Sequence, residues 1–233
     1  MPYSLVLLDY DGTLCDTRRA ISYSLRRALA ELGQPAPAEA ALQAVVQRGL
    51  PLAETLQQLR PPGARPAPAE WVETYRAIYR TEAEELVTPF PGAADTLAAT
   101  RAAGAEIVVI SNKGLAILEN SLRRLGLYDY AALVVADDRA ATGRPRPLKP
   151  DPALYADFIR PRFPHIGPAH TLMVGDTATD LQFARNCGLA AAWVTFGFGT
   201  AAECLPLQPA YQLHQLSELP PLLTGPTAAP AFA

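Results

Sequence analysis

Two aspartates separated by one residue, Asp9 and Asp11, directly follow the short apolar run of residues 4–8. In an extended chain, residues i and i+2 point the same way, so this spacing predicts two neighbouring carboxylates at the end of a strand. Gly12 follows and permits a sharp turn whose backbone N–H groups can bind an anion, which makes Gly12 and Thr13 candidate phosphate-binding residues. A solvated acidic turn is the alternative interpretation. The apolar run before the aspartates favours a functional site.

A second acidic pair lies late in the chain. Asp176 follows the apolar run of residues 171–174, and Asp180 falls in the first turn of the next predicted helix, where the helix dipole stabilises an anion. A simple capping role is the alternative for Asp180. If both strands lie centrally in one sheet, this pair converges with Asp9 and Asp11.

Four converging carboxylates need a counter-ion. At ~4 Å and an effective dielectric constant of roughly 20, each repelling pair costs about 4 kcal/mol. Oxygen ligands without histidine or cysteine neighbours select a hard cation, so Mg²⁺ is the predicted metal. The predicted metal-binding residues are Asp9, Asp11, Asp176 and Asp180.

Further polar side chains follow the apolar run of residues 107–110. Ser111 offers a hydroxyl and Asn112 an amide, both suited to phosphate oxygens, although either could instead cap a helix. Lys149 lies in a proline-rich loop that restricts its direction, and a cluster of carboxylates requires such a cation nearby. A lone surface lysine is the alternative for Lys149.

The elements that must position these residues form a repeating pattern. Short apolar runs, typical of strands buried on both faces, alternate with helical patterns that mostly end in glycine. The predicted strands are residues 4–8, 107–110, 133–136, 171–174 and 190–195. This alternation predicts an α/β fold with a Rossmann-like parallel sheet and helices on both sides, in which ligands bind beyond the carboxyl ends of the strands.

One interval interrupts the alternation. Residues 16–87 contain no predicted strand, only helical patterns separated by proline and glycine, and the last of these carries Trp71 and Tyr75 on one apolar stripe. We therefore expect an inserted small α-helical cap domain at residues 16–87 and a Rossmann-like catalytic core made of residues 1–15 and 88–224. Residues 225–233 are expected to form a flexible tail.

Composition excludes several classes of protein. The 233 residues are 49% hydrophobic and carry a net charge of −3 without a basic block, which argues against binding to nucleic acid. Three cysteines without a C-x-x-C spacing argue against a disulfide framework and a thiolate zinc site. No segment has the pattern of a membrane span or a signal peptide, so we expect a cytoplasmic protein that does not bind membranes. Neither a Ser-His-Asp arrangement nor a P-loop is found.

Four motifs occur together: D-x-D-G-T-L at residues 9–14, S-N-K at 111–113, K-P-D-P at 149–152 and G-D-T-x-x-D at 175–180. In this order they resemble the haloacid dehalogenase superfamily of phosphohydrolases, and the resemblance covers nearly the whole chain. The S-N-K motif and residues 88–92 are similar to the phosphoglycolate phosphatase branch of that superfamily.

The resemblance implies a mechanism. Asp9 would attack phosphorus and become an aspartyl-phosphate, and Asp11 would protonate the leaving alcohol and then activate water. It also implies that Mg²⁺ binds the Asp9 carboxylate, the backbone carbonyl of Asp11 and Asp176, while Asp180 steadies the water shell of the metal. Lys149, with the Ser111 hydroxyl, would hold the transferred phosphoryl group.

The expected function is therefore a Mg²⁺-dependent phosphatase acting on a small phosphorylated metabolite, with 2-phosphoglycolate as the best substrate. Asp11 argues for phosphate chemistry because the dehalogenases of the superfamily lack this second aspartate. A pyrophosphatase or a sugar-phosphate mutase of the same superfamily remains open, as does a non-catalytic member that binds a phosphorylated ligand. Arg48 lies in a loop that resembles the substrate-selecting loop and is a candidate contact for a substrate carboxylate. The protein is expected to be a monomer or homodimer.

Overall fold

A computed structural model describes residues 2–61, 63–144 and 146–224, so the predicted tail at 225–233 lies outside the described residues. Its centre is a six-stranded parallel sheet in the order β5-β4-β1-β6-β7-β8, as the sequence pattern predicts for a Rossmann-like core. The strands of this sheet are β1 (Leu5–Leu8), β4 (Glu106–Gly114), β5 (Leu133–Asp137), β6 (Thr171–Gly175), β7 (Ala190–Val194) and β8 (Tyr211–Leu213). Two further short strands, β2 (Cys15–Asp16) and β3 (Thr88–Pro89), form a separate pair.

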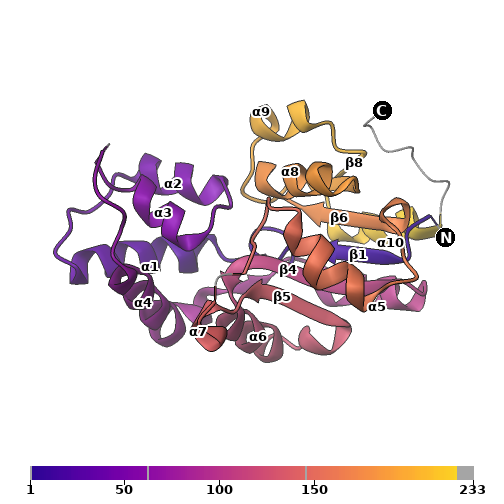
Figure 1. The fold of residues 1–233 in the computed structure, drawn as a ribbon, viewed down its shortest axis with the longest axis horizontal. Helices are drawn as coiled ribbons and strands as arrows, with labels where there is room; N and C mark the ends of the chain where they lie inside the picture. The colour runs from indigo at the N-terminus through magenta and orange to yellow at the C-terminus, as the bar shows by residue number, and fades with distance from the viewer. Residues whose placement is uncertain (1, 62, 145, 225–233) are drawn as a thin grey trace.

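Helices cover both faces of this sheet and form a separate group at one end of the molecule (Figure 1). The α-helices are α1 (Arg18–Glu31), α2 (Glu39–Gln47), α3 (Leu52–Gln58), α4 (Ala69–Ile78), α5 (Ala93–Ala102), α6 (Leu115–Arg124), α7 (Arg139–Thr142), α8 (Ala178–Cys187), α9 (Ala201–Cys204) and α10 (Leu219–Thr224). None of the described helices has the length and apolar character needed to cross a membrane.

Strand β1 shows why the sheet is buried on both faces. Its residues alternate in direction, so Val6 and Leu8 pack into one apolar cluster while Leu5 and Leu7 pack into the other. All four side chains are buried because helices cover each face. A continuous apolar run is therefore the expected sequence of this strand.

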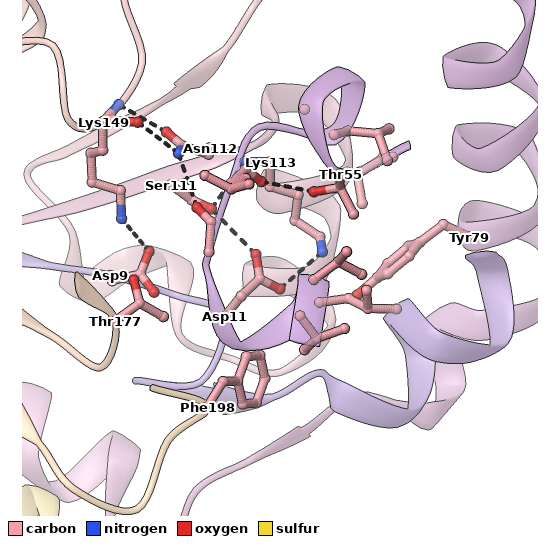
Figure 2. Close-up of a pocket in the computed structure, with 18 of the residues that line it drawn as sticks. Asp9, Asp11, Thr55, Tyr79, Ser111, Asn112, Lys113, Lys149, Thr177 and Phe198 are labelled. Atoms are coloured by element: carbon pink, nitrogen blue, oxygen red, sulfur yellow. Dashed lines mark hydrogen bonds and ion pairs between the residues drawn. The ribbon is translucent and has the colours of Figure 1, made fainter. Parts of the chain in front are cut away.

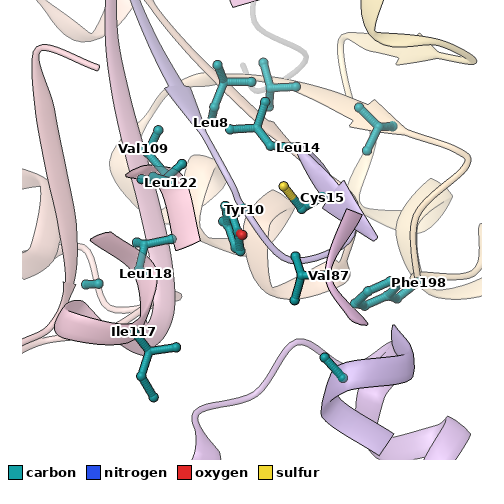
Figure 3. Close-up of a cluster of buried hydrophobic side chains, with 14 of the residues drawn as sticks. Leu8, Tyr10, Leu14, Cys15, Val87, Val109, Ile117, Leu118, Leu122 and Phe198 are labelled. Atoms are coloured by element: carbon teal, nitrogen blue, oxygen red, sulfur yellow. The ribbon is translucent and has the colours of Figure 1, made fainter. Parts of the chain in front are cut away.

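The larger apolar cluster lies beneath the turn that follows β1 (Figure 3). Tyr10, between Asp9 and Asp11, is fully buried in this cluster, and its hydroxyl is hydrogen-bonded to the hydroxyl of Ser121 in α6. The period-two alternation thus directs Tyr10 into the core while its two acidic neighbours face the opposite side. The core anchors the turn that carries both carboxylates.

Helices α1–α4 lie between β2 and β3, where the sequence predicts an inserted cap. Strands β2 and β3 pair antiparallel, so the two connections to this insertion run side by side. Its buried face includes Trp71, Tyr75 and Ile78, and a π-helical turn at Tyr79–Ala83 continues α4. Figure 1 shows these helices at one end of the molecule, beyond the edge where the sheet strands end.

Two features of the sheet were not predicted. Strand β8 has only three residues, too few to produce a recognisable apolar run. Strand β4 extends to Gly114 with an irregular register after Ile110, so the S-N-K residues belong to the strand itself. Polar residues at the end of an apolar strand resemble a loop in sequence.

Candidate active site

The order of the sheet brings the predicted motifs together. Strand β1 lies between β4 and β6, so Asp9 at the end of β1 has the end of β4 on one side and the end of β6 on the other. Ser111 lies within β4, and Asp176 directly follows β6. Asp180 comes from the first turn of α8, whose N-terminus faces the same edge.

Three buried carboxylates form the centre of the site. Asp9, Asp176 and Asp180 each present an oxygen, and these oxygens lie within 4.8 Å of one another. All three residues are at most 5% exposed. Asp11 lies apart from them, because its carboxylate is directed to Ser111 Oγ at 3.3 Å and to Lys113 Nζ at 3.0 Å.

Lys149 supplies one positive charge to this cluster (Figure 2). Its Nζ donates to Asp9 Oδ1 at 2.5 Å, to Asp180 Oδ1 at 2.7 Å and to the carbonyl of Ile110 at 3.2 Å. Burial opposes the charged ammonium, but the two adjacent carboxylates raise the pKa of Lys149 above its ordinary value. Lys149 is therefore a permanent cation in the site.

One ammonium does not balance three carboxylates. Burial raises the pKa of Asp9 well above its ordinary value, and the charges of Asp180 and Asp176 add to this effect while Lys149 opposes it. Burial, together with the charge of Asp180, raises the pKa of Asp176 to about 7. A buried, oxygen-only set of ligands with surplus negative charge fits a hard divalent cation.

Local hydrogen bonds hold Asp180 in position. Its Oδ2 accepts hydrogen bonds from the backbone N–H of Thr177 at 3.0 Å and from the Thr177 hydroxyl at 2.8 Å. Asp180 therefore caps α8, the alternative role that the sequence left open, and its other carboxylate oxygen binds Lys149. The capping contacts orient the carboxylate towards the cluster.

Asp176 is held by a close-packed shell that the sequence analysis did not identify. Its Oδ2 accepts the backbone N–H of Phe198 at 2.7 Å, and its Oδ1 accepts the Thr13 hydroxyl at 3.1 Å. A Cβ added at Gly12 would lie 2.1 Å from Asp176 Oδ2, and one at Gly197 would lie 2.2 Å from Asp176 Cβ. Only glycine fits at these two positions.

Gly12 and Thr13, the candidate phosphate-binding residues, have partners within the protein. The N–H of Gly12 donates to the carbonyl of Cys15 at 2.8 Å, so it is not free to bind a phosphate. The Thr13 hydroxyl donates to Asp176, and neither residue lines the pocket beside the cluster. Both residues orient Asp176 instead.

The side chain of Asn112, another candidate phosphate ligand, also has partners within the protein. Its amide oxygen accepts the Lys149 N–H at 2.9 Å, and its Nδ2 donates to the carbonyls of Lys149 at 2.9 Å and Gly49 at 3.3 Å. Both amide N–H groups are thus used on backbone carbonyls. Asn112 fixes the loop that carries Lys149 and joins it to the helical insertion.

Arg48 does not reach the pocket. Arg48 directly follows α2, and its exposed guanidinium donates to Gln58 Oε1 at 2.9 Å. Its carbonyl does contact the core, accepting the Thr179 hydroxyl at 2.7 Å. The loop at 48–49 therefore binds the N-terminal turn of α8 through its backbone, not through the arginine charge.

A pocket opens beside the cluster, with a cavity of about 100 Å³ between the core and the helical insertion. Asp9, Asp11, Ser111 and Lys149 line its core side. Lys113 of the S-N-K motif also lines the pocket, and no local sequence pattern indicates this position. Only the fold shows that Lys113 faces Asp11.

A parallel sheet with buried carboxylates at its carboxyl edge and an adjoining helical insertion has the architecture of an α/β enzyme. Residues 6–194 match the model of the haloacid dehalogenase-like hydrolase family. The chain is 30% identical over 232 residues to the plasmid phosphoglycolate phosphatase of Cupriavidus necator, covering 99% of this chain and 97% of the relative. It is 28% identical over 201 residues to the phosphoglycolate phosphatase of Thiobacillus denitrificans, covering 85% and 86%.

The fold agrees with these relationships. A solved haloacid dehalogenase-like family hydrolase from Streptococcus pneumoniae superposes with a TM-score of 0.78 at 21% identity, covering 93% of this chain and 96% of that chain. The chain therefore belongs to the haloacid dehalogenase-like hydrolases. Within them it is similar to enzymes named phosphoglycolate phosphatase.

The raised pKa of Asp176, caused first by burial and then by the charge of Asp180, predicts a pH dependence of stability. An acid whose pKa rises from 3.8 to about 7 on folding binds extra protons in the folded state, so the stability that it contributes is present below pH 4 and is lost as the pH rises through 7. In excess chelator, Asp176→Asn should reduce the loss of unfolding free energy between pH 5 and pH 7.5 by about 2 kcal/mol. Urea unfolding measures this, with the exposed Asp95→Asn as control. Equal pH slopes for wild type and Asp176→Asn would contradict it.

Two glycine variants separate backbone strain from crowding at Asp176. Gly12 and Gly126 both have a left-handed backbone, with φ of 85° and 68°, but a Cβ at Gly126 meets nothing within 4 Å. Each alanine variant should lose about 1 kcal/mol of stability from the backbone alone. Only Gly12→Ala should also weaken Mg²⁺ binding in calorimetry, by at least about tenfold, because it displaces Asp176. Unchanged Mg²⁺ affinity in Gly12→Ala would argue against Asp176 as a ligand.

Proposed function

We propose that the protein is a Mg²⁺-dependent phosphatase that hydrolyses a small phosphate monoester through an aspartyl-phosphate on Asp9. The observation that carries this proposal is the contrast between two neighbouring carboxylates. Asp9 lies buried in the acidic cluster beside Lys149, whereas Asp11 is separate and faces the pocket beside Lys113 and Ser111. Two carboxylates in different environments suit two different chemical roles.

In the first step, a carboxylate oxygen of Asp9 attacks phosphorus and the bond from phosphorus to the leaving oxygen breaks. Asp11 donates its proton to that oxygen, so the alcohol leaves neutral. In the second step, Asp11 takes a proton from water, the water oxygen attacks the phosphorus of the aspartyl-phosphate, and the bond from phosphorus to the Asp9 oxygen breaks. Inorganic phosphate leaves, and both aspartates return to their initial states.

Lys149 and Ser111 would bind the phosphoryl oxygens. Lys149 already contacts Asp9, so its charge offsets the repulsion between the nucleophile and the phosphate dianion. Asp9, Asp176 and Asp180 fit the set of residues that would hold Mg²⁺, with Asp11 contributing a backbone carbonyl as in the family pattern. When bound, Mg²⁺ would neutralise charge that develops on the phosphoryl group.

The helical insertion at 16–87 would act as the cap over this site. Its loop at 48–49 contacts the Thr179 hydroxyl and the Asn112 amide, so the cap closes directly on the residues that surround the cluster. Closure excludes water, which protects the aspartyl-phosphate, and substrate must enter when these few contacts open. The paired strands β2 and β3 are the connections about which the cap would move.

The leading substrate is 2-phosphoglycolate. The relatives named phosphoglycolate phosphatase support it, as does the small cavity. The cap side of the pocket is mainly apolar, with Ile21, Leu25, Val45, Val46, Leu50 and Leu52 among its described lining residues. Such a wall offers few partners for sugar hydroxyls, so it does not favour the sugar-phosphate mutase. The non-catalytic alternative is disfavoured because Asp9, Asp11 and Lys149 are all present.

The two aspartate roles predict different kinetic signatures with 4-nitrophenyl phosphate and Mg²⁺. Asp9→Asn should remove turnover by at least about 1,000-fold and give no burst, because no phosphoenzyme forms. Asp11→Asn should release about one equivalent of nitrophenolate in a burst, since this leaving group needs no proton, followed by turnover slowed about 100-fold or more. Rapid-quench experiments that follow the absorbance of nitrophenolate measure the burst and the steady-state rate. Equal turnover in wild type and both variants would refute the proposed roles, and the exposed Asp95→Asn is the matched control.

Removal of the metal predicts a reversible loss of activity. Excess EDTA should abolish hydrolysis, and Mg²⁺ should restore it, because the acidic cluster without a cation repels the phosphate. The assay compares rates before chelation, after it and after Mg²⁺ addition. Full activity in excess chelator would exclude a metal-dependent mechanism.

A further inference from the structure

Lys113 stands out among the groups that the mechanism leaves unused. Its side chain is 9% exposed, and its Nζ binds Asp11 Oδ1 at 3.0 Å and lies 3.9 Å from the centroid of the Tyr79 ring. An ammonium has three N–H donors, and among the described residues Asp11 is its one hydrogen-bond acceptor. Such a buried cation retains capacity for a further anionic partner.

The surroundings of Lys113 contain a second unused donor. The Tyr79 hydroxyl is fully buried, lies in a residue that lines the pocket and has no hydrogen-bond partner among the described residues. Figure 2 shows Lys113 extending from β4 between Asp11 and Tyr79. A buried polar group without a partner is costly unless a ligand satisfies it.

We propose that Lys113 and the Tyr79 hydroxyl form a subsite that binds a carboxylate on the leaving alcohol of the substrate. The inference rests on the proposed phosphatase activity and assigns recognition to residues other than Arg48. It identifies the substrate class as phosphate esters of 2-hydroxy acids.

The position of Asp11 gives this subsite its geometry. As the proposed proton donor, Asp11 must lie within hydrogen-bond reach of the leaving oxygen, and Lys113 lies beside Asp11 on the pocket side. In a 2-hydroxy acid ester, the carboxyl carbon is only two bonds from that oxygen. A carboxylate there comes within reach of the Lys113 ammonium while the phosphate remains at Asp9.

The apolar cap wall strengthens this preference. Side chains such as Ile21, Leu25 and Val45 border the same pocket and lower the local dielectric, so a carboxylate and an ammonium attract more strongly than in water. A neutral polar group that enters this pocket loses its hydration and gains few hydrogen bonds from the apolar wall. Charge at this position should therefore decide substrate choice.

The test compares 2-phosphoglycolate with its amide, which has the same size and lacks the charge. Wild-type protein with Mg²⁺ should prefer the acid by about 100-fold in kcat/KM, and Lys113→Met should reduce the preference to within about threefold. Tyr79→Phe should reduce it by about threefold to tenfold. Arg80→Met, which removes an exposed charge next to Tyr79, is the matched control and should keep the full preference.

The outcomes separate this inference from the proposed function. If wild type hydrolyses 4-nitrophenyl phosphate but does not distinguish the acid from the amide, the subsite is wrong and the phosphatase stands. If Lys113→Met slows both substrates equally, Lys113 only positions Asp11 and the subsite is again wrong. If wild type hydrolyses none of the three esters, the proposed function itself fails. Thermal unfolding of each variant confirms that it is folded.

Discussion

The rest of the site depends on the confinement of three carboxylates and one ammonium at the carboxyl edge of the sheet. Asp9, Asp176 and Asp180 are held within a few ångströms although their charges repel, so each needs its own restraint. Lys149 binds two of them, the N-terminus of α8 holds Asp180, and the Phe198 N–H holds Asp176. The resulting excess of negative charge suits a hard divalent cation.

Neighbouring residues connect this edge of the sheet to the helical insertion. Asn112 binds both the Lys149 backbone and the Gly49 carbonyl, and Thr179 binds the Arg48 carbonyl. On the side of the insertion, these contacts use backbone carbonyls. An ion pair of 2.7 Å joins Arg76 of α4, which lines the pocket, to Asp137 at the end of β5. The insertion therefore contacts the core through α8, through the end of β4 and through the end of β5.

Much of the fold could be predicted because its signals are local. Apolar runs predicted the strands of the parallel sheet, and the acidic motifs marked the ends of β1 and β6. Side-chain chemistry was harder, because a hydroxyl or amide that suits phosphate equally suits a backbone carbonyl. Thr13 and Asn112 satisfy their hydrogen bonds within the protein, and the Arg48 guanidinium faces Gln58. The position of Lys113 could not be predicted, because its partner, Asp11, is more than a hundred residues away in the chain.

By itself the sequence determined the α/β architecture and the candidate acids. The order of apolar runs, the Asp-x-Asp spacing at Asp9 and Asp11, and the glycine that follows are all properties of short segments. Only the tertiary structure decided which polar group serves which partner. It separates Asp11 from the other three carboxylates and places Lys113 on the pocket wall, because strand order and the packing of the insertion set distances that no local pattern contains.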